Sequence, residues 1–288
     1  MYNVGLILEG GAFRGIFTAG VLDFFMEKEL FFPYVIGVSA GACCAFNYVA
    51  NQPHRTKDCM LYRNGADSYY GLHTFIETHR IIDFEKLFFE YPHKQFPFDS
   101  KTYKESETVN ETVVSNCLTG KAEYFCEKDS FERGALVCEA SCAVPFFTEP
   151  VTISDTPYMD GGITDPIPLK RSIEKGNSKN IVILTKHEGF KSKLNPNIMN
   201  LSSRLLRKYP EFAVAYAKRE EVYAEEVHFL NEQVSNGDVF LIRPEVHTID
   251  VFEFSESKLL SFYEHGYKIG EKCYPQLIKF LGDERIDK

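Results

Sequence analysis

The chain has 288 residues, 44% of them hydrophobic, and a formal net charge of −9. This length and composition predict one large α/β domain and exclude a disordered chain. The acidic balance argues against a nucleic-acid partner, because such a partner requires clustered Lys and Arg side chains to displace counterions from phosphate.

The cysteines and the apolar segments limit the class of protein further. Most of the eight cysteines stand in apolar surroundings, where a free thiol packs as a small hydrophobic group. No Cys-x-x-Cys pair and no EF-type loop occur, so neither a zinc nor a calcium site is expected. The N-terminal residues lack a secretory pattern, and no apolar stretch approaches membrane-spanning length. We therefore expect a cytoplasmic protein.

The first predicted element is a strand over residues 4–8, followed by a glycine-rich loop over residues 9–15. After the loop, apolar residues recur at helical spacing. A dinucleotide fingerprint requires glycine where Ala12 stands, and a Walker loop requires Lys and Ser/Thr where Ile16 and Phe17 stand. Neither nucleotide-binding motif fits this loop.

The second predicted strand ends in Gly37-Val38-Ser39-Ala40-Gly41 and leads into a helix. Gly-x-Ser-x-Gly is typical of a nucleophile elbow, although a plain strand-to-helix turn has the same pattern. The unfavourable backbone of the serine leaves no room for side chains two positions away, which explains both glycines. Ser39 would stand at a helix start, where free N–H groups favour negative charge.

The glycine loop and Ser39 are expected to face one crevice, because the turns after parallel strands emerge at the same sheet edge. There the N–H groups of the loop, with that of Ala40, would converge on the carbonyl oxygen of an acyl group attacked by Ser39. Each such donor is worth about 3–4 kcal/mol. Arg14 would add a positive charge; the alternative is a solvated arginine, which the helix dipole disfavours at this position.

Residues 51–121 interleave aromatic and charged residues and keep no clean period. We expect a cap over the crevice, helical over residues 82–89 and 104–118, that covers an apolar ligand and opens as a mobile lid. The alternative is an ordinary insertion whose aromatic side chains pack into the core.

The remaining chain alternates strands and helices. Strands are expected over residues 122–126, 180–185 and 239–242, and helices over residues 131–142, 204–234 and 255–280. Asp160-Gly161-Gly162 follows Tyr158-Met159 at a strand end, where the carboxylate can point along the sheet edge. By itself, Asp-Gly-Gly usually marks only a turn.

Three motifs, taken together and in order, resemble those of the patatin-like phospholipase family. They are Glu-Gly-Gly-Ala-Phe-Arg-Gly at 9–15, Gly-Val-Ser-Ala-Gly at 37–41 and Asp-Gly-Gly at 160–162. The stretch Ala-Val-Pro-Phe-Phe at 143–147 also resembles the Ala-x-Pro-x-x-Phe element that usually precedes the family's aspartate. The resemblance covers roughly the first two thirds of the chain.

The resemblance implies a three-layer α/β/α fold with a mainly parallel central sheet and a helical cap insertion. It implies hydrolysis of lipid acyl esters by a Ser-Asp dyad, with Ser39 as nucleophile and Asp160 as base. The oxyanion hole would comprise Gly10, Gly11, Ala12, Arg14 and Ala40, and the remaining motif positions are Gly15, Gly37, Gly41, Gly161 and Gly162. No cofactor is expected, because serine attack needs neither metal nor nucleotide. The expected partners are a lipid acyl ester and, transiently, a membrane surface.

Two positions depart from the family pattern. Ala12 replaces the usual third glycine, which would narrow the oxyanion hole, although its N–H is retained. Asp165 stands where an asparagine is frequent.

We expect a catalytic domain over residues 1–190, including the cap over residues 51–121, and a C-terminal α/β extension over residues 191–288 packed on the same domain.

Two alternatives to the dyad remain. One is a Ser-His-Asp esterase or thioesterase, since Gly-x-Ser-x-Gly usually belongs to a triad, with His187 or His265 as its histidine. The other is a lipid-binding regulatory module without turnover. The sequence leaves the physiological acyl ester and the oligomeric state open.

Overall fold

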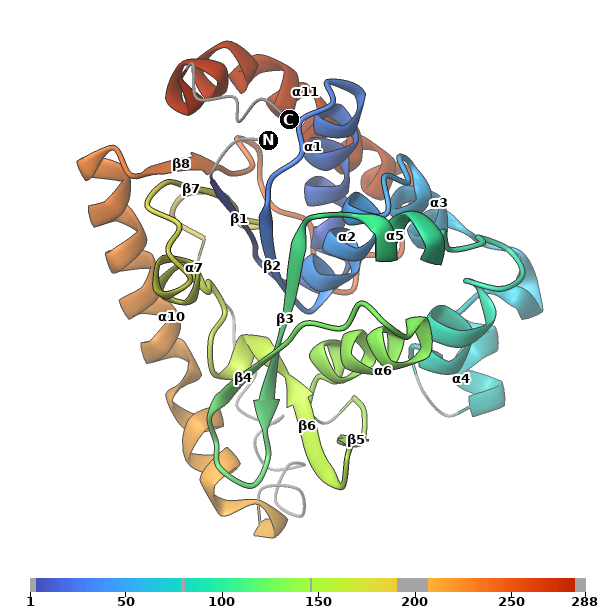
Figure 1. Cartoon of the computed structure of the whole chain (residues 1–288). Coiled ribbons are helices and arrows are strands. Elements are labelled where there is room, and N and C mark those ends of the chain that lie inside the picture. Colours follow the sequence, from blue (N-terminus) through green and yellow to red (C-terminus); the bar gives the residue numbers. More distant parts are fainter. Residues whose placement is uncertain (1–3, 79–80, 146, 191–206, 283–288) are drawn as a thin grey trace.

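A mixed β-sheet forms the centre of the computed structural model, which describes residues 4–78, 81–145, 147–190 and 207–282. The strand order is β5-β6-β3-β2-β1-β7-β8, and β4 also pairs with β3 (Figure 1). The strands are β1 Gly5–Leu8, β2 Tyr34–Val38, β3 Val109–Asn116, β4 Ala122–Phe125, β5 Val151–Ile153, β6 Thr156–Asp160, β7 Asn180–Ile183 and β8 Val239–Ile242. The run from β3 to β8 is parallel, whereas β4, β5 and β6 are antiparallel to their neighbours.

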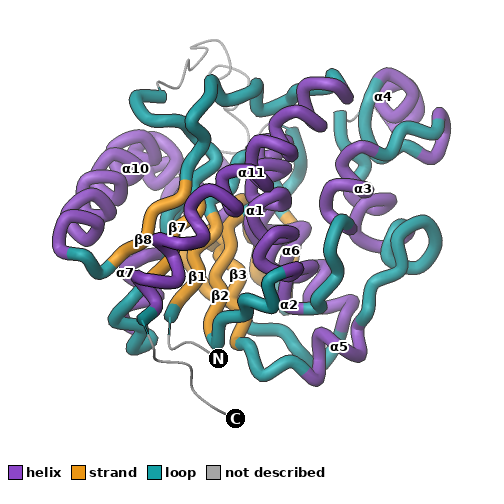
Figure 2. The backbone as a smooth tube through the Cα atoms, turned by 90° about the horizontal axis from the view of Figure 1, so that it is seen from above, coloured by secondary structure: helices purple, strands orange, loops and turns teal. Residues whose placement is uncertain are grey.

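Helices cover both faces of the sheet, which gives three layers (Figure 2). On one face lie α1 Gly15–Glu27, α2 Ala40–Val49, α6 Phe131–Cys142 and α11 Glu256–Leu281; on the other lie α7 Leu169–Glu174 and α10 Pro210–Asn236. Leu6 and Leu8 of β1 belong to the core on the α1 side, and Ile7 belongs to the core on the α10 side. Such burial on both faces is typical of parallel strands. The expected α/β/α fold with a mainly parallel sheet is confirmed.

The first two strands end side by side. Leu8, the last residue of β1, pairs with Gly37 in β2 in parallel register. The segment after each strand therefore leaves the same edge of the sheet: the glycine loop with its single turn η1 Ala12–Arg14, and the turn at Ser39. This edge carries the candidate site.

Residues 207–282 add one strand, β8, to the same sheet. Strand β8 pairs with β7, and α11 packs directly on α1. A Cβ atom on Gly20 would lie 2.2 Å from the carbonyl oxygen of Tyr263, so the two helix backbones touch at this point. The expected division of the chain at residue 190 remains a prediction.

One expected helix is wrong. Residues 104–118 hold the end of α5 Ser100–Glu105 and then strand β3, which lies in the middle of the sheet. The strand carries polar side chains that are buried and bonded, such as Asn110 to the Tyr103 hydroxyl and Ser115 to the carbonyl of Asp160. Its sequence therefore lacks the apolar run by which a buried strand is recognised.

The cap was expected over residues 51–121, but residues 109–116 form β3. The cap is therefore limited to the segment between α2 and β3, residues 51–108, at the right of Figure 1. It contains α3 Arg55–Leu61, η2 Gly65–Asp67, α4 Leu72–Thr78, the single π-helical turn η3 Lys86–Glu90, and α5. The helix expected over residues 82–89 is thus present only in part. Cap aromatics pack into the core next to α1, with Phe13 edge-on to Tyr70 at 4.8 Å between ring centroids.

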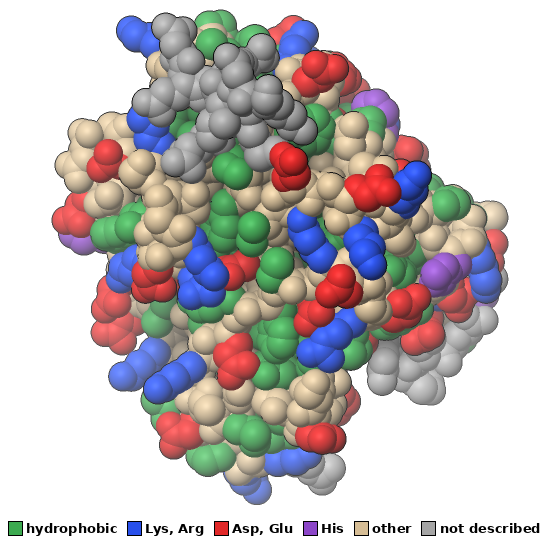
Figure 3. All heavy atoms as spheres, viewed as in Figure 1, with side chains coloured by type: hydrophobic (Ala, Val, Ile, Leu, Met, Phe, Trp, Pro, Cys, Tyr) green, Lys and Arg blue, Asp and Glu red, His purple; other side chains and the backbone are tan. Residues whose placement is uncertain are grey.

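The surface carries charges of both signs. On the face shown in Figure 3, Lys and Arg side chains are interspersed with Asp and Glu. No helix in the described ranges combines the length and the apolar character needed to cross a membrane.

Candidate active site

Ser39 occupies a strained turn between β2 and α2. Its backbone has φ 54° and ψ −125°, a conformation that costs a non-glycine residue on the order of 1–3 kcal/mol. A Cβ atom on Gly37 would lie 2.6 Å from the backbone of Ala42, and one on Gly41 would lie 2.4 Å from the carbonyl oxygen of Leu8. Only glycine fits at these two positions, as expected from the sequence.

The side chain of Ser39 is bonded to that of Asp160. Ser39 Oγ donates to Asp160 Oδ2 at 2.8 Å, and the N–H of Gly162 donates to Asp160 Oδ1 at 2.8 Å. Ser39 is 7% exposed and Asp160 8% exposed. Burial raises the pKa of Asp160 to about 6, against the hydrogen bonds from Gly162 and Ser39, which lower it. A carboxylate with this pKa is a better proton acceptor than a solvated one.

Close packing holds Asp160 at the end of β6. The turn η4 Gly161–Ile163 follows directly, and a Cβ atom on Gly161 would lie 2.3 Å from the carbonyl oxygen of Val113 in β3. Ser115, also in β3, donates to the carbonyl oxygen of Asp160 at 2.7 Å. Gly161 thus allows the turn to approach the sheet closely.

Ser141 of α6 supports Ser39 and was not singled out from the sequence. The backbone N–H of Ser39 donates to Ser141 Oγ at 2.8 Å, and Ser141 Oγ donates to the carbonyl of Val113 at 2.7 Å. The residue lies in a run of small side chains at the end of α6 that matches no motif. Only its contact across 102 positions of the chain distinguishes it.

The glycine loop lies against Ser39. A Cβ atom on Gly10 would be 2.9 Å from Ser39 Cβ, and Thr185 Oγ1 fixes the loop by donating to the carbonyl of Gly10 at 2.7 Å. Gly11 has φ 151° and Ala12 has φ 48°. Ala12 is therefore left-handed, a conformation that glycine adopts without strain and that costs other residues roughly 1–2 kcal/mol. This explains in physical terms why a third glycine would suit the position.

Of the groups expected in the oxyanion hole, the N–H of Ala40 has no partner within its helix, whereas the Arg14 side chain is bonded elsewhere. The N–H of Ala40 stands at the first position of α2, where the helix offers it no carbonyl partner. Arg14 Nε donates to the carbonyl of Ile249 at 3.0 Å, and its guanidinium lies 4.7 Å from the centroid of the Phe190 ring. Burial lowers the pKa of Arg14. The Arg14 side chain thus joins η1 to the segments that follow β7 and β8. Its part in an oxyanion hole remains a prediction.

The two histidines considered for a triad have other partners. His187 Nδ1 accepts a hydrogen bond of 3.1 Å from the N–H of Thr248, and His265 Nε2 accepts one of 3.0 Å from the N–H of Glu245. Within the described residues, no hydrogen bond joins either ring to Ser39 or Asp160. Also within these residues, no group of three or more His, Cys, Asp or Glu side chains is arranged to hold a metal ion.

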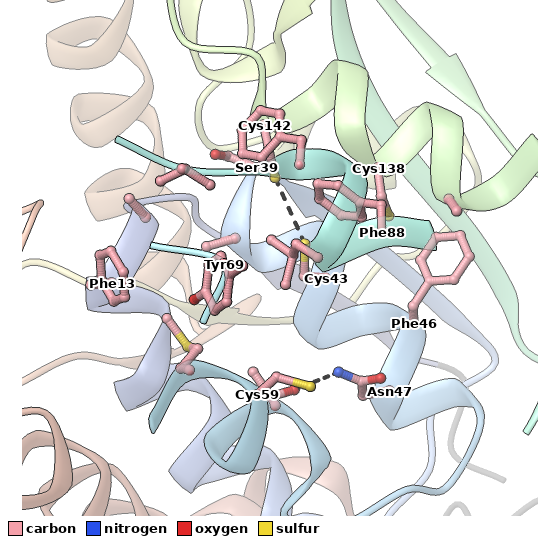
Figure 4. Close-up of a pocket in the computed structure, with 18 of the residues that line it drawn as sticks. Phe13, Ser39, Cys43, Phe46, Asn47, Cys59, Tyr69, Phe88, Cys138 and Cys142 are labelled. Carbon is pink, nitrogen blue, oxygen red and sulfur yellow. Dashed lines mark hydrogen bonds between the residues drawn. The ribbon is translucent and has the colours of Figure 1, made fainter. Parts of the chain in front are cut away.

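A cavity of about 160 Å³ opens beside Ser39 (Figure 4). Its wall is mostly apolar and comes from η1, α2, α6 and the cap; the labelled side chains include Phe13, Cys43, Phe46, Tyr69, Phe88, Cys138 and Cys142. Asn47 lies at the opposite end of the view from Ser39. The cap aromatics therefore serve both of the roles that the sequence left open, since they pack into the core and also line the cavity.

Comparison with known proteins identifies the class. The sequence profile of the patatin-like phospholipase family matches residues 6–172, more than half of the chain. The chain therefore belongs to the patatin-like phospholipase family, a family of lipid acyl hydrolases. A second profile, a domain of unknown function (DUF6363), matches residues 209–282.

Among particular proteins, the chain is similar to the uncharacterized protein YjjU of Escherichia coli strain K12, with 30% identity over 196 residues. The alignment covers 64% of this chain and 52% of YjjU, so the chain spans about half the length of this relative. It is also similar in structure to VipD from Legionella pneumophila, with a TM-score of 0.48 and 14% identity over 98% of this chain and 70% of that one.

Proposed function

We propose that this protein hydrolyses acyl esters of lipids through an acyl-enzyme on Ser39, with Asp160 as the base. The observation that carries the proposal is the 2.8 Å hydrogen bond from Ser39 Oγ to Asp160 Oδ2 at the wall of an apolar cavity. A serine hydroxyl is a weak nucleophile until a base within hydrogen-bond reach accepts its proton. Asp160 is within that reach without an intervening histidine.

The first half of the reaction transfers the acyl group to Ser39. Asp160 accepts the hydroxyl proton while Ser39 Oγ attacks the carbonyl carbon, and the carbonyl oxygen becomes an oxyanion. The C–O bond to the alcohol then breaks, and the proton on Asp160 passes to the leaving alkoxide. In the second half, Asp160 takes a proton from water as the water oxygen attacks the acyl carbon. The bond from that carbon to Ser39 Oγ then breaks, the proton on Asp160 passes to Ser39 Oγ, and the carboxylic acid is released.

Backbone N–H groups would stabilise the oxyanion. The N–H of Ala40 points from the start of α2, and Gly10, Gly11 and Ala12 belong to the loop packed against Ser39. The N–H of Ser39 already donates to Ser141 and is not free for this purpose. Fixed donors of this kind cost no reorganisation as the charge develops, which is the source of their effect on rate.

The cavity favours an apolar acyl chain as the group that is bound. Its wall is formed largely by phenylalanine, tyrosine, cysteine and aliphatic side chains, with few polar side chains among them. Burial of an acyl chain there is favourable at about 25 cal/mol per Å² of apolar surface removed from water. We therefore place the acyl tail in this cavity and the alcohol part of the ester toward its opening.

The test compares Ser39→Ala, Asp160→Asn and wild type on p-nitrophenyl esters of increasing chain length and on phospholipids and lysophospholipids. Both variants should lose at least 1000-fold in kcat/KM, on the order of 4 kcal/mol, while still unfolding in one cooperative thermal transition. A serine-directed phosphonate should label wild type at Ser39. Wild-type turnover in Ser39→Ala would show that Ser39 is not the nucleophile and would overturn the proposal.

Histidine variants separate the dyad from the triad. His187→Ala and His265→Ala should retain most of the activity, because their rings are bonded to the N–H groups of Thr248 and Glu245. A folded histidine variant as inactive as Asp160→Asn would instead establish a Ser-His-Asp esterase. Binding of lipid by wild type without any turnover or labelling would establish a lipid-binding module.

A further inference from the structure

Three cysteine thiols meet in the wall of the cavity beside Ser39. Cys43 comes from α2, and Cys138 and Cys142 come from successive turns of α6 (Figure 4). The Sγ atoms of Cys43 and Cys142 are 3.7 Å apart, although the residues are 99 positions apart in the chain. Both thiols are free and only partly buried, so a molecule in the cavity can reach them.

Cys43 and Cys142 are both close in the chain to residues that hold the nucleophile Ser39. Cys43 follows Ser39 by one helical turn, and its N–H donates to the Ser39 carbonyl at 3.3 Å. Cys142 follows Ser141, whose hydroxyl accepts the hydrogen bond from the Ser39 N–H. The two sulfur atoms therefore connect the same two helices as the contact between Ser39 and Ser141.

The pKa values of the two thiols are shifted in opposite directions. Hydrogen bonds to Cys43 from Cys138 and then Cys142 lower the pKa of Cys43, and the positive charge of Arg55 acts in the same direction. The pKa of Cys142 is raised by its hydrogen bond to Cys43 and by burial. Because the thiolate is the nucleophile in thiol chemistry, Cys43 is the attacking group and Cys142 the resolving one.

We propose that Cys43 and Cys142 form a dithiol site that reduces peroxides entering the acyl cavity and becomes a disulfide. The Cys43 thiolate attacks the terminal O–H oxygen of the peroxide and the O–O bond breaks. The leaving group takes a proton: an alkoxide becomes an alcohol, and the hydroxide from hydrogen peroxide becomes water. Cys43 is then a sulfenic acid. The Cys142 sulfur attacks the Cys43 sulfur, the S–O bond breaks as the S–S bond forms, and the sulfenic hydroxyl group leaves as water with the proton of Cys142.

The peroxide has two sources, hydrogen peroxide and a hydroperoxide carried on an acyl chain. The second source rests on the proposed function, because it requires the cavity to hold an acyl chain. The first does not. The site's chemistry is the same for both.

Oxidation should lower hydrolysis. An S–S bond of about 2.05 Å requires the sulfur atoms to approach from 3.7 Å, which draws α2 and α6 together beneath Ser39. A displacement of even about 1 Å at a catalytic group costs on the order of 100-fold in rate. We expect oxidised wild type to lose at least tenfold in kcat and to recover it when dithiothreitol is added.

The experiment treats reduced protein with one equivalent of hydrogen peroxide or of linoleic acid hydroperoxide and maps the cysteine peptides by mass spectrometry. The expected product is a peptide pair joined through Cys43 and Cys142, absent from Cys43→Ser and Cys142→Ser and present in Cys126→Ser, which removes an exposed thiol outside the cavity. Faster linkage by the acyl hydroperoxide identifies a lipid source, and faster linkage by hydrogen peroxide a small one; both support the dithiol.

Mapping in Ser39→Ala keeps this test independent of hydrolysis. The linked pair of cysteine peptides should form in this variant too. If wild type forms the linked pair but is never labelled by the phosphonate, only the proposed function is overturned. Oxidation confined to Cys126, or Cys43 carried to sulfinic acid with Cys142 unmodified, would overturn the dithiol. A linked pair that leaves kcat unchanged would overturn the predicted effect on Ser39.

Discussion

The N–H of Ser39 and the hydroxyl of Ser141 are 2.8 Å apart, and this contact ties the nucleophile's backbone to helix α6. Ser141 is fully buried, so Ser141→Ala would leave the Ser39 N–H buried without its partner. Such an unsatisfied donor costs about 1–3 kcal/mol. We expect the free energy of unfolding to fall by that amount and kcat to fall about tenfold, as Ser39 shifts relative to Asp160.

Ser130→Ala is the matched control on the same helix. Ser130 caps α6 by accepting from the N–H of Arg133 at 3.2 Å, and loss of such a cap costs about 1 kcal/mol. Urea denaturation should show a loss of stability in both variants, whereas steady-state kinetics should show lower kcat only in Ser141→Ala. Equal kcat values in Ser141→Ala and Ser130→Ala would show that Ser141 contributes to stability but does not position Ser39.

The second prediction concerns pH. Because burial raises the pKa of Asp160 to about 6, the base is protonated below that pH and available above it. We expect kcat/KM to rise with pH through about 6 and to level off near 7. A profile of kcat/KM from pH 4.5 to 8 tests this, and a rise centred near pH 4 would show that Asp160 is not buried during the reaction.

The same pKa predicts a stability difference. The folded pKa of Asp160 lies above its usual value of 3.8, so its contribution to stability is complete below pH 4 and is lost as pH rises through about 6. Asp160→Asn does not ionise. Its free energy of unfolding should therefore gain on that of wild type by on the order of 2–3 kcal/mol between pH 4 and 7. A difference that stays constant with pH would contradict the raised pKa.

The third prediction concerns Ala12, whose φ of 48° is left-handed. Ala12→Gly removes the steric cost of that conformation, partly offset by the greater freedom of glycine in the unfolded chain. We expect the free energy of unfolding to rise by about 0.5–1 kcal/mol with hydrolysis retained. Ala12→Val should lower it, because a β-branched side chain is disfavoured at positive φ. A less stable Ala12→Gly variant would show that the alanine methyl group contributes more than the strain costs.

The fourth prediction tests the cap as the surface that meets lipid. Phe75 and Ile76 of α4 are 49% and 65% exposed, at the opposite side of the molecule from α10 (Figure 2). Replacing both with serine should reduce hydrolysis of micellar substrate several-fold and leave hydrolysis of monomeric short esters unchanged. Val214→Ser on α10, where the side chain is 55% exposed, should change neither rate.

Substrate titrations across the critical micelle concentration provide the measurement. Wild type should show a rise in rate at that concentration, and the Phe75/Ile76 double variant should not. A rate that passes smoothly through the transition in wild type would argue against both the lid and the membrane contact.

The features that depend on local backbone geometry were readable from the sequence. The elbow at Ser39 needs residues without side chains at Gly37 and Gly41, and these requirements act within a few positions of the chain. The parallel sheet follows similarly, since strand, loop and helix follow one another directly after β1 and after β2, and the edge strand β8 is continuously apolar. Its bounds, 239–242, agree with those expected.

The tertiary structure alone decided the features whose partners are distant in the chain. Strand β3 has a polar sequence because its buried side chains find partners elsewhere in the fold, as Asn110 does at Tyr103. The contacts of Ser39 with Ser141, and of Cys43 with Cys142, join α2 to α6 across about a hundred residues. Periodicity reports which face of an element is buried but not which residues of two elements meet, because that is fixed by how the helices pack on the sheet.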